Sequence, residues 1–268
     1  MTQLLPNFAL FVKPWKSLSL PELGKHVRRL GFEWIELPIR PGFACEPDTI
    51  EKSLPEAVRV LGEEGVKVLN ITTALRLNDE HLYHASSKAG VSMNRVMFER
   101  QAGENYWDAE NRARKALDEA QPLCEQYGFQ IGVQNHNGRF VPVNAMGMHH
   151  LVKDYDPRYI GAIWDPAHNA LEGEEPEPAL DMVASHLCVV NLKNAFWQRV
   201  SGPEAQEASW SVYWTSGRQG RASWKRVADK LKAMRYQGPL CFSAEYTQEK
   251  DVDRLIVEDL AYAQACFC

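Results

Sequence analysis

Short apolar runs alternate with amphipathic segments along the whole chain. Runs of about four to eight residues rich in β-branched and aromatic side chains, bounded by turn-forming residues, are typical of buried strands. The last four of these runs are apolar nearly throughout, as in a parallel sheet covered on both faces. The eight expected strands cover residues 8–14, 34–39, 66–72, 94–99, 129–136, 159–165, 187–194 and 239–246.

A segment with helical periodicity follows each expected strand. Ser223 is a favourable first residue for one of these helices, and glycines such as Gly90 and Gly128 mark helix ends. The expected helices cover residues 20–31, about 54–64, 79–90, 107–128, 143–155, 177–185, 223–238 and 252–267. A long loop is expected at about 195–222, and loops of this length tend to be functional. Its aromatic residues include Phe196, Trp197, Trp210, Tyr213 and Trp214.

Eight strand–helix units in strict alternation predict an α/β fold with a parallel sheet. The number of units favours a closed (β/α)8 barrel, or TIM barrel, over an open sheet. One such barrel needs about 250 residues, so residues 1–268 are expected to form a single domain. No Gly-x-Gly-x-x-Gly segment follows any expected strand, which leaves a dinucleotide-binding fold without its motif.

Composition narrows the class of protein. Hydrophobic residues make up 45% of the chain and charged residues 24%, which is typical of globular domains. The net charge of -5, without a basic stripe, argues against nucleic acid as a partner. We expect neither a membrane span, because no stretch approaches about 20 apolar residues, nor a signal peptide. The six cysteines show no metal or disulfide spacing, so a cytoplasmic protein with reduced thiols is expected.

Polar side chains gather where the expected strands end, which is where the active sites of such barrels lie. Because side chains alternate along a strand, Gln134 and His136 are expected to share a face. The residues at these ends are Glu36 and Arg40 on strand two, Gln134, Asn135 and His136 on strand five, Asp165 and His168 on strand six, Asn191 and Lys193 on strand seven, and Glu245 on strand eight.

The order of these motifs resembles the xylose isomerase-like family of sugar and sugar-phosphate isomerases and epimerases, over nearly the whole chain. In that family strand five often reads Glu-Asn-His, strand six Asp-Pro-x-His/Asn, strand seven His-x-Lys-Asp, and strand eight ends on Glu. The matching segments here are "VQNHNG", "WDPAHN", "NLKN" and "SAEY". The segment "GFEWIELP" is similar to the family's Gly-Phe-x-x-x-Glu, which contributes Glu36 near the substrate.

The resemblance implies a divalent cation (Mn²⁺, Mg²⁺ or Zn²⁺) at Gln134, Asp165, Asn191 and Glu245. Two of these positions carry amides, which offer an oxygen but no charge, and such cations prefer charged oxygen ligands. The cation is therefore either weakly held or absent. A third interpretation is that His136 or His168 replaces the lost ligands and recentres the metal.

The resemblance also implies a sugar isomerase or epimerase that moves a proton on the carbon beside a carbonyl. Glu245 is the expected base. Gln134 cannot accept a proton, so Lys193, His136 or His168 is the candidate second acid or base. The residues expected to contact substrate are Glu36, Arg40, Asn135, His168 and Trp197.

Several alternatives stay open on the sequence. A dehydratase or lyase acting on an oxidised sugar or cyclitol begins with the same proton removal, and a non-catalytic carbohydrate-binding barrel is a third hypothesis. Structural roles also remain: Asp165 as a turn cap, Glu36 paired with Arg40, and Lys193 paired with Glu245 or Asp165. The expected partner is a small sugar, with neither nucleic acid nor membrane, and the chain is a candidate homo-oligomer.

Overall fold

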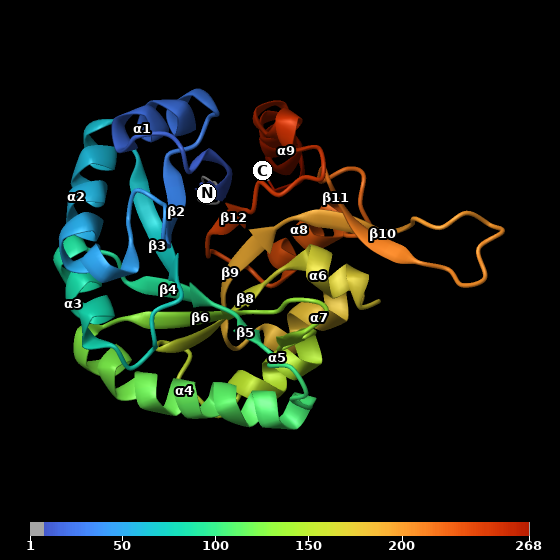
Figure 1. Ribbon diagram of the computed structural model, residues 1–268, viewed down its shortest axis with the longest axis horizontal. Helices are drawn as coiled ribbons and strands as arrows, with labels where there is room; N and C mark the ends of the chain where they lie inside the picture. Colours follow the sequence, from blue (N-terminus) through green and yellow to red (C-terminus); the bar gives the residue numbers. More distant parts are fainter. Residues whose placement is uncertain (1–7, 268) are drawn as a thin grey trace.

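Eight parallel strands close into a barrel in the computed structural model, which describes residues 8–267 (Figure 1). Neighbouring strands follow the order β1-β12-β9-β8-β6-β4-β3-β2 around the barrel. The predicted (β/α)8 fold is therefore confirmed. The barrel strands are β1 (Phe8–Phe11), β2 (Trp34–Ile39), β3 (Lys67–Thr73), β4 (Met93–Val96), β6 (Gln130–Gln134), β8 (Ile160–Trp164), β9 (Leu187–Leu192) and β12 (Leu240–Phe242).

Helices surround the barrel and cover the outer face of its strands (Figure 1). Ser19 and Glu22 form a capping box on the first helix, and Asn105 caps the longest one. Gly90 and Gly128 end their helices in the left-handed conformation, as predicted. The helices are α1 (Leu20–Arg29), α2 (Ile50–Glu63), α3 (Glu80–Ala89), α4 (Tyr106–Tyr127), α5 (Ala145–Val152), α6 (Pro166–Leu171), α7 (Pro176–Val183), α8 (Trp224–Ala233) and α9 (Val252–Phe267).

The barrel interior carries a small apolar cluster and a polar layer. Ile163 and Val189 belong to the apolar cluster. Gly132 makes room for it, because a Cβ atom there would lie 2.6 Å from Cδ1 of Ile163. The polar layer lies towards the carboxyl ends of the strands, since Gln134 is the last residue of β6 and Asn191 the last but one of β9. The polar layer is therefore built on the ends of the barrel strands.

The segment after β9 is a β-hairpin, and the prediction of a long loop at 195–222 was wrong. Strands β10 (Asn194–Arg199) and β11 (Trp210–Thr215) pair antiparallel, and the hairpin extends outward from the barrel (Figure 1). Aromatic and β-branched residues favour such pairing. Phe196 and Tyr213 lie opposite each other with ring centroids 5.1 Å apart.

Other boundaries also differ from the prediction. The run expected as strand four ends in the barrel at Val96, and the next residues form β5 (Phe98–Glu99), which pairs with β7 (Phe140–Val141). Helix α2 begins before the predicted residue 54 and contains Pro55, because buried Ile50 already packs in the core.

Two further differences concern helices α8 and α6. Helix α8 ends at Ala233 before the predicted Gly238, and Arg235 adopts the left-handed conformation in place of a glycine. Helix α6 was not predicted, because its single Asp-Pro start also suits a turn. None of the helices within residues 8–267 has the length and apolar character needed to cross a membrane.

Candidate active site

Asp165 caps the N-terminus of helix α6 and is completely buried. Its Oδ1 accepts hydrogen bonds from the backbone N–H groups of Ala167 (2.9 Å) and His168 (3.2 Å). Its Oδ2 accepts from Gln134 Nε2 at 3.0 Å and from Asn191 Nδ2 at 3.1 Å. Burial raises the pKa of Asp165 to about 6, although Lys193 and the helix N–H groups act in the opposite direction. With four donors on two oxygens, this carboxylate holds strand ends together.

A second buried carboxylate, Glu36 on β2, is paired with Arg95 on β4. Arg95 Nε donates to Glu36 Oε1 at 2.7 Å, and Asn70 Nδ2 donates to Glu36 Oε2 at 3.0 Å. Arg95 also donates to the side-chain oxygen of Gln134. A continuous network therefore runs from Glu36 through Arg95 and Gln134 to Asp165. The predicted alternative that Glu36 pairs with Arg40 was wrong.

Lys193 lies at the centre of the second group of site residues. Its Nζ is 2.6 Å from Glu245 Oε2 and 3.2 Å from His168 Nε2. The same atom lies 3.6 Å from the centroid of the Trp214 ring, a cation–π contact. Lys193 is buried, whereas the Glu245 side chain is 43% exposed. The pair thus joins a buried cation to an exposed carboxylate at the mouth of the barrel, the end where the strands have their carboxyl ends.

The two candidate histidines stack on each other and are held in neutral form. Their ring centroids are 3.7 Å apart, and burial lowers the pKa of His136 to about 4 and that of His168 well below its usual range. His168 is engaged at both nitrogens, by Asn137 Oδ1 at 2.8 Å and by Lys193 Nζ. His136 Nδ1 donates to the Asn137 carbonyl at 2.9 Å, which leaves its Nε2 as an acceptor.

Glu245 follows a strained residue. Ala244 has a φ of 48°, in the left-handed region that a non-glycine residue adopts at a cost of about 1 kcal/mol. The regular alternation of side chains along a strand therefore does not extend past β12 to Glu245. Burial raises the pKa of Glu245, but the adjacent Lys193 charge and hydrogen bond leave it below its usual value. Glu245 is accordingly ionised near neutral pH.

Asp259 on α9 fixes the segment that carries Glu245. Its Oδ1 accepts from Gly217 N at 2.8 Å and its Oδ2 from the Tyr246 hydroxyl at 2.8 Å. Burial raises the pKa of Asp259 to about 6, while these two hydrogen bonds act in the opposite direction. The folded protein therefore favours the protonated form of this carboxyl group more than the unfolded chain does.

Replacing Asp259 with asparagine is expected to change how stability depends on pH. A carboxyl whose folded pKa is raised contributes stability that is complete below pH about 4 and lost as the pH rises through about 6. The introduced amide cannot ionise and can still bond to Gly217 and Tyr246. Urea unfolding from pH 4 to pH 8 should show D259N gaining up to about 3 kcal/mol on the parent protein. Parallel pH curves for the two proteins would contradict the assignment.

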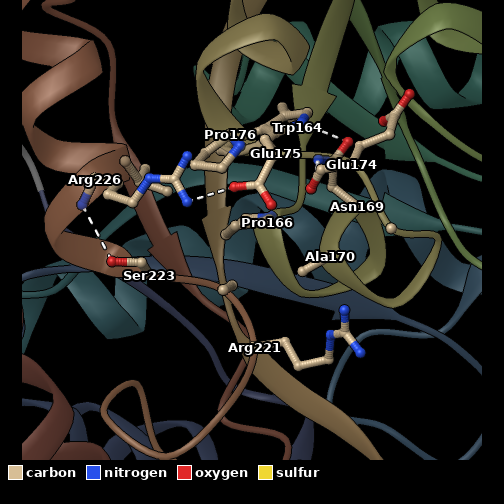
Figure 2. Close-up of a pocket in the computed structure, with 13 residues that line it drawn as sticks. Trp164, Pro166, Asn169, Ala170, Glu174, Glu175, Pro176, Arg221, Ser223 and Arg226 are labelled. Atoms are coloured by element: carbon tan, nitrogen blue, oxygen red, sulfur yellow. Dashed lines mark hydrogen bonds and ion pairs between the residues drawn. The ribbon is translucent and has the colours of Figure 1, made fainter.

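A pocket of about 500 Å³ opens beside Glu245 at the mouth of the barrel. Phe11, Arg40 and Tyr246 contribute to its walls. A smaller cavity of about 90 Å³ lies outside the barrel, between α6, α7 and α8, where Glu175 and Arg226 turn towards each other (Figure 2). The larger pocket is the candidate substrate site because it includes Glu245.

Most of the predicted site residues lie at the mouth of the barrel, but two that were expected to contact substrate, Asn135 and Trp197, bond to the protein backbone. Asn135 turns to the backbone of Asp165, accepting from its N–H at 2.8 Å and donating to its carbonyl at 3.2 Å. Trp197 lies on the hairpin, 39% exposed, and donates to the Leu171 carbonyl at 3.1 Å. The aromatic ring that contacts the Lys193 ammonium is that of Trp214 and not that of Trp197.

Two site residues, Arg95 and Trp214, were missed by the sequence reasoning. Arg95 had a visible signal, since a charged residue inside an otherwise apolar parallel strand must find a buried partner. Trp214 was recognised only as one of several aromatic residues in the expected loop. Its neighbours depend on the pairing of β10 with β11, which the sequence did not predict.

The donor set at the four expected metal positions does not fit a divalent cation. Gln134 and Asn191 both point their NH₂ groups at Asp165, and the Gln134 oxygen is taken by Arg95. Glu245 is paired with the Lys193 ammonium, which would repel a cation bound beside it. Within residues 8–267, no group of three or more His, Cys, Asp or Glu side chains is arranged as a metal site.

Comparison with known proteins identifies a family over most of the chain. The model of the xylose isomerase-like TIM barrel family matches residues 25–266. No curated protein matches the sequence.

Solved structures with the same fold share little sequence with this chain. The 3-keto-D-glucoside 4-epimerase from E. coli has a TM-score of 0.75 and 12% identity, covering 97% of this chain and 100% of its own. A xylose isomerase-like protein from Mycobacterium smegmatis in complex with magnesium has a TM-score of 0.70 and 15% identity, covering 98% and 97%. A probable 3-DHS dehydratase from Bacillus anthracis has a TM-score of 0.67 and 11% identity, covering 95% and 97%.

Proposed function

The chain belongs to the xylose isomerase-like TIM barrel family, and from this premise we propose that it is an enzyme that moves a proton on the carbon beside a carbonyl of a sugar or sugar derivative. The observation that carries the proposal is the Lys193–Glu245 pair, 2.6 Å apart, beside the large pocket at the mouth. Such a pair supplies a base and an adjacent positive charge, which this chemistry requires.

Glu245 is proposed as the base. It is the site carboxylate with an exposed side chain, and its lowered pKa keeps it ionised near pH 7. Asp165 is completely buried and saturated with donors, so its proposed role is to anchor α6 and the strand ends. Glu36 has a comparable anchoring role through Arg95.

Lys193 is proposed to stabilise the negative charge of the enediolate that forms when Glu245 removes the proton. The neutral His136 is proposed to relay a proton between neighbouring substrate oxygens through its free Nε2. His168 positions Lys193, because its Nε2 accepts from Nζ at 3.2 Å. No step in this scheme depends on a divalent cation.

The single exposed base favours isomerisation over epimerisation. Inversion at a carbon by two opposed bases needs a proton acceptor on each face of the substrate. The position on β6 that would supply the second carboxylate is Gln134, which is held by Arg95 and Asp165. One base on one face can instead carry a proton between neighbouring carbons.

A lyase acting on an oxidised sugar or cyclitol is the second candidate. The side-by-side arrangement of Glu245 and Lys193 supports it, because the carboxylate can take the proton while the ammonium protonates a leaving hydroxyl on the same face. Mass analysis of products distinguishes the two, since elimination releases water and isomerisation does not change the mass.

Solvent exchange tests the proposal directly. The protein is incubated in D₂O with a panel of ketoses, keto-sugars, sugar acids and sugar phosphates, and deuterium at carbon is followed by NMR. Incorporation with at least one compound is expected. The absence of exchange across the panel, with and without added Mn²⁺ or Mg²⁺, would favour a non-catalytic carbohydrate-binding barrel.

Chelation is expected to leave the activity unchanged. The Lys193 ammonium already provides positive charge beside Glu245, and the amide groups at Gln134 and Asn191 face Asp165 with their NH₂ ends. Exchange rates should agree within about twofold before and after EDTA treatment, and elemental analysis should find well under one Mn, Mg or Zn per chain. Loss of activity on chelation and recovery with one metal would overturn this part of the proposal.

A small sugar derivative is the partner that we propose for the pocket. The cytoplasmic location and the homo-oligomer stay predictions from the sequence.

A further inference from the structure

The large pocket beside Glu245 carries an excess of positive charge. Lys13, Lys16 and Arg40 line it, together with the carboxylates of Glu245 and Glu249. Glu245 is already paired with Lys193. The pocket therefore presents three cations against one carboxylate, Glu249, that is not paired with Lys193, in a chain whose net charge is -5.

The three cations have no ion-pair partner within residues 8–267. Glu36 and Glu245, whose charges reach Arg40 and Lys13, are engaged by Arg95 and Lys193. Elsewhere many cations are paired, as Arg226 is with Glu175 and Glu177. Arg40 is moreover partly buried, with its guanidinium 6.0 Å from the Phe11 ring centroid. Withdrawing a guanidinium from water without a carboxylate is unfavourable unless a ligand offsets the cost.

The backbone segments that carry these side chains are anchored. The Arg40 N–H donates to the Cys45 carbonyl at 3.1 Å, and the Arg40 carbonyl accepts from Phe43 N at 3.1 Å. Lys13 opens the 3₁₀ helix η1 (Lys13–Trp15), which is tied to α9 by a 2.8 Å hydrogen bond from Trp15 Nε1 to Asp253 Oδ1. The cations are thus held on short anchored segments and not on a free loop.

We propose that Arg40, Lys13 and Lys16 form an anion subsite that binds a phosphate or carboxylate group of the substrate. This inference rests on the proposed function, because it takes the pocket beside Glu245 as the substrate site. It names the substrate class as an anionic sugar derivative, either a sugar phosphate or a sugar acid. Arg40 supplies the fork of donors that matches both groups, and the lysines add charge.

Binding of inorganic phosphate tests the subsite without any need for turnover. Isothermal titration calorimetry on the full chain compares the parent protein, R40Q, the K13Q/K16Q double variant and K88Q. Lys88 is an exposed cation in the last turn of α3 and is the charge-matched control. We expect R40Q to weaken phosphate binding by about 10- to 100-fold and K88Q to change it less than about twofold. Equal binding by the parent protein, R40Q and K13Q/K16Q, or no binding at all, overturns the subsite.

The exchange assay then distinguishes the two sources of the anion. Fructose 6-phosphate and glucuronate are compared with fructose and glucose, and the better anionic compound identifies the phosphate or the carboxylate class. R40Q should raise the KM of that compound about 10- to 100-fold, with a smaller change in kcat. Efficient exchange with neutral sugars and no phosphate binding would overturn the subsite but keep the proposed function. Phosphate binding that R40Q abolishes, without exchange on any compound, would keep the subsite and reject the proposed function.

Discussion

Replacing Glu245 with glutamine is expected to reduce solvent exchange into the best substrate by about 10²- to 10⁴-fold, the usual contribution of a positioned base. The amide keeps the size of the side chain and can still accept a hydrogen bond from Lys193, so binding should change little. Exchange followed by NMR gives the rate, and calorimetry with phosphate gives the binding. The expected pattern is a fall in kcat with nearly constant KM.

Glu125 provides the matched control for this substitution. It is an exposed carboxylate near the end of α4, away from the pocket, and it accepts a hydrogen bond from Gln121. E125Q should exchange at the parent rate and unfold at the parent temperature. E245Q should unfold at a lower temperature than the parent, because it leaves the buried Lys193 ammonium without its carboxylate, so its exchange is measured where both variants are folded. If E245Q retained full exchange, Glu245 would not be the base and the one-base scheme would fail.

The barrel was predictable because its pattern is local and repeated. Each strand–helix unit shows its own apolar run and amphipathic segment, and glycines such as Gly90 and Gly128 end helices where a left-handed residue is needed. The hairpin after β9 was not predictable in this way. Its two strands pair across a connection of ten residues, so neither strand shows a tight-turn signal next to it.

The predicted fold implied that polar residues would gather at the strand ends. It did not imply which of these side chains would bond to each other. Asp165, Lys193 and Glu245 meet at one mouth because parallel strands end at the same rim. Whether Glu36 would bond to Arg40 or to Arg95 depends on which side chains point inward. That choice depends on barrel register, including the irregularity between Ile35 and Glu36 in the β2–β3 pair.

Protein cations contact the residues at which the family resemblance implies a metal. Lys193 pairs with Glu245, and Arg95 donates to Gln134, whose NH₂ group in turn donates to Asp165. Four protein donors occupy the two oxygens of Asp165, and the Lys193 ammonium lies against one oxygen of Glu245. The amides at Gln134 and Asn191 are thus consistent with their neighbours and do not indicate a damaged site.

Replacing Arg95 with methionine is expected to cost about 3–5 kcal/mol of folding free energy, because it leaves the Glu36 carboxylate buried without its cation. For a chain of this length that corresponds to a fall of about 6–20 °C in melting temperature. Gln134 would also lose the donor that orients its amide, so the contact to Asp165 should loosen. Differential scanning calorimetry at pH 7 gives the shift.

The E36Q/R95M double variant distinguishes a buried charge from simple loss of packing. The glutamine that replaces Glu36 is neutral and can still accept the hydrogen bond from Asn70, so the double variant should recover several degrees relative to R95M alone. A packing defect caused by the loss of Arg95 would not respond to the change at position 36. Two results would contradict this role of the Glu36–Arg95 pair. One is a fall of less than about 3 °C for R95M, and the other is a double variant that is no more stable than R95M.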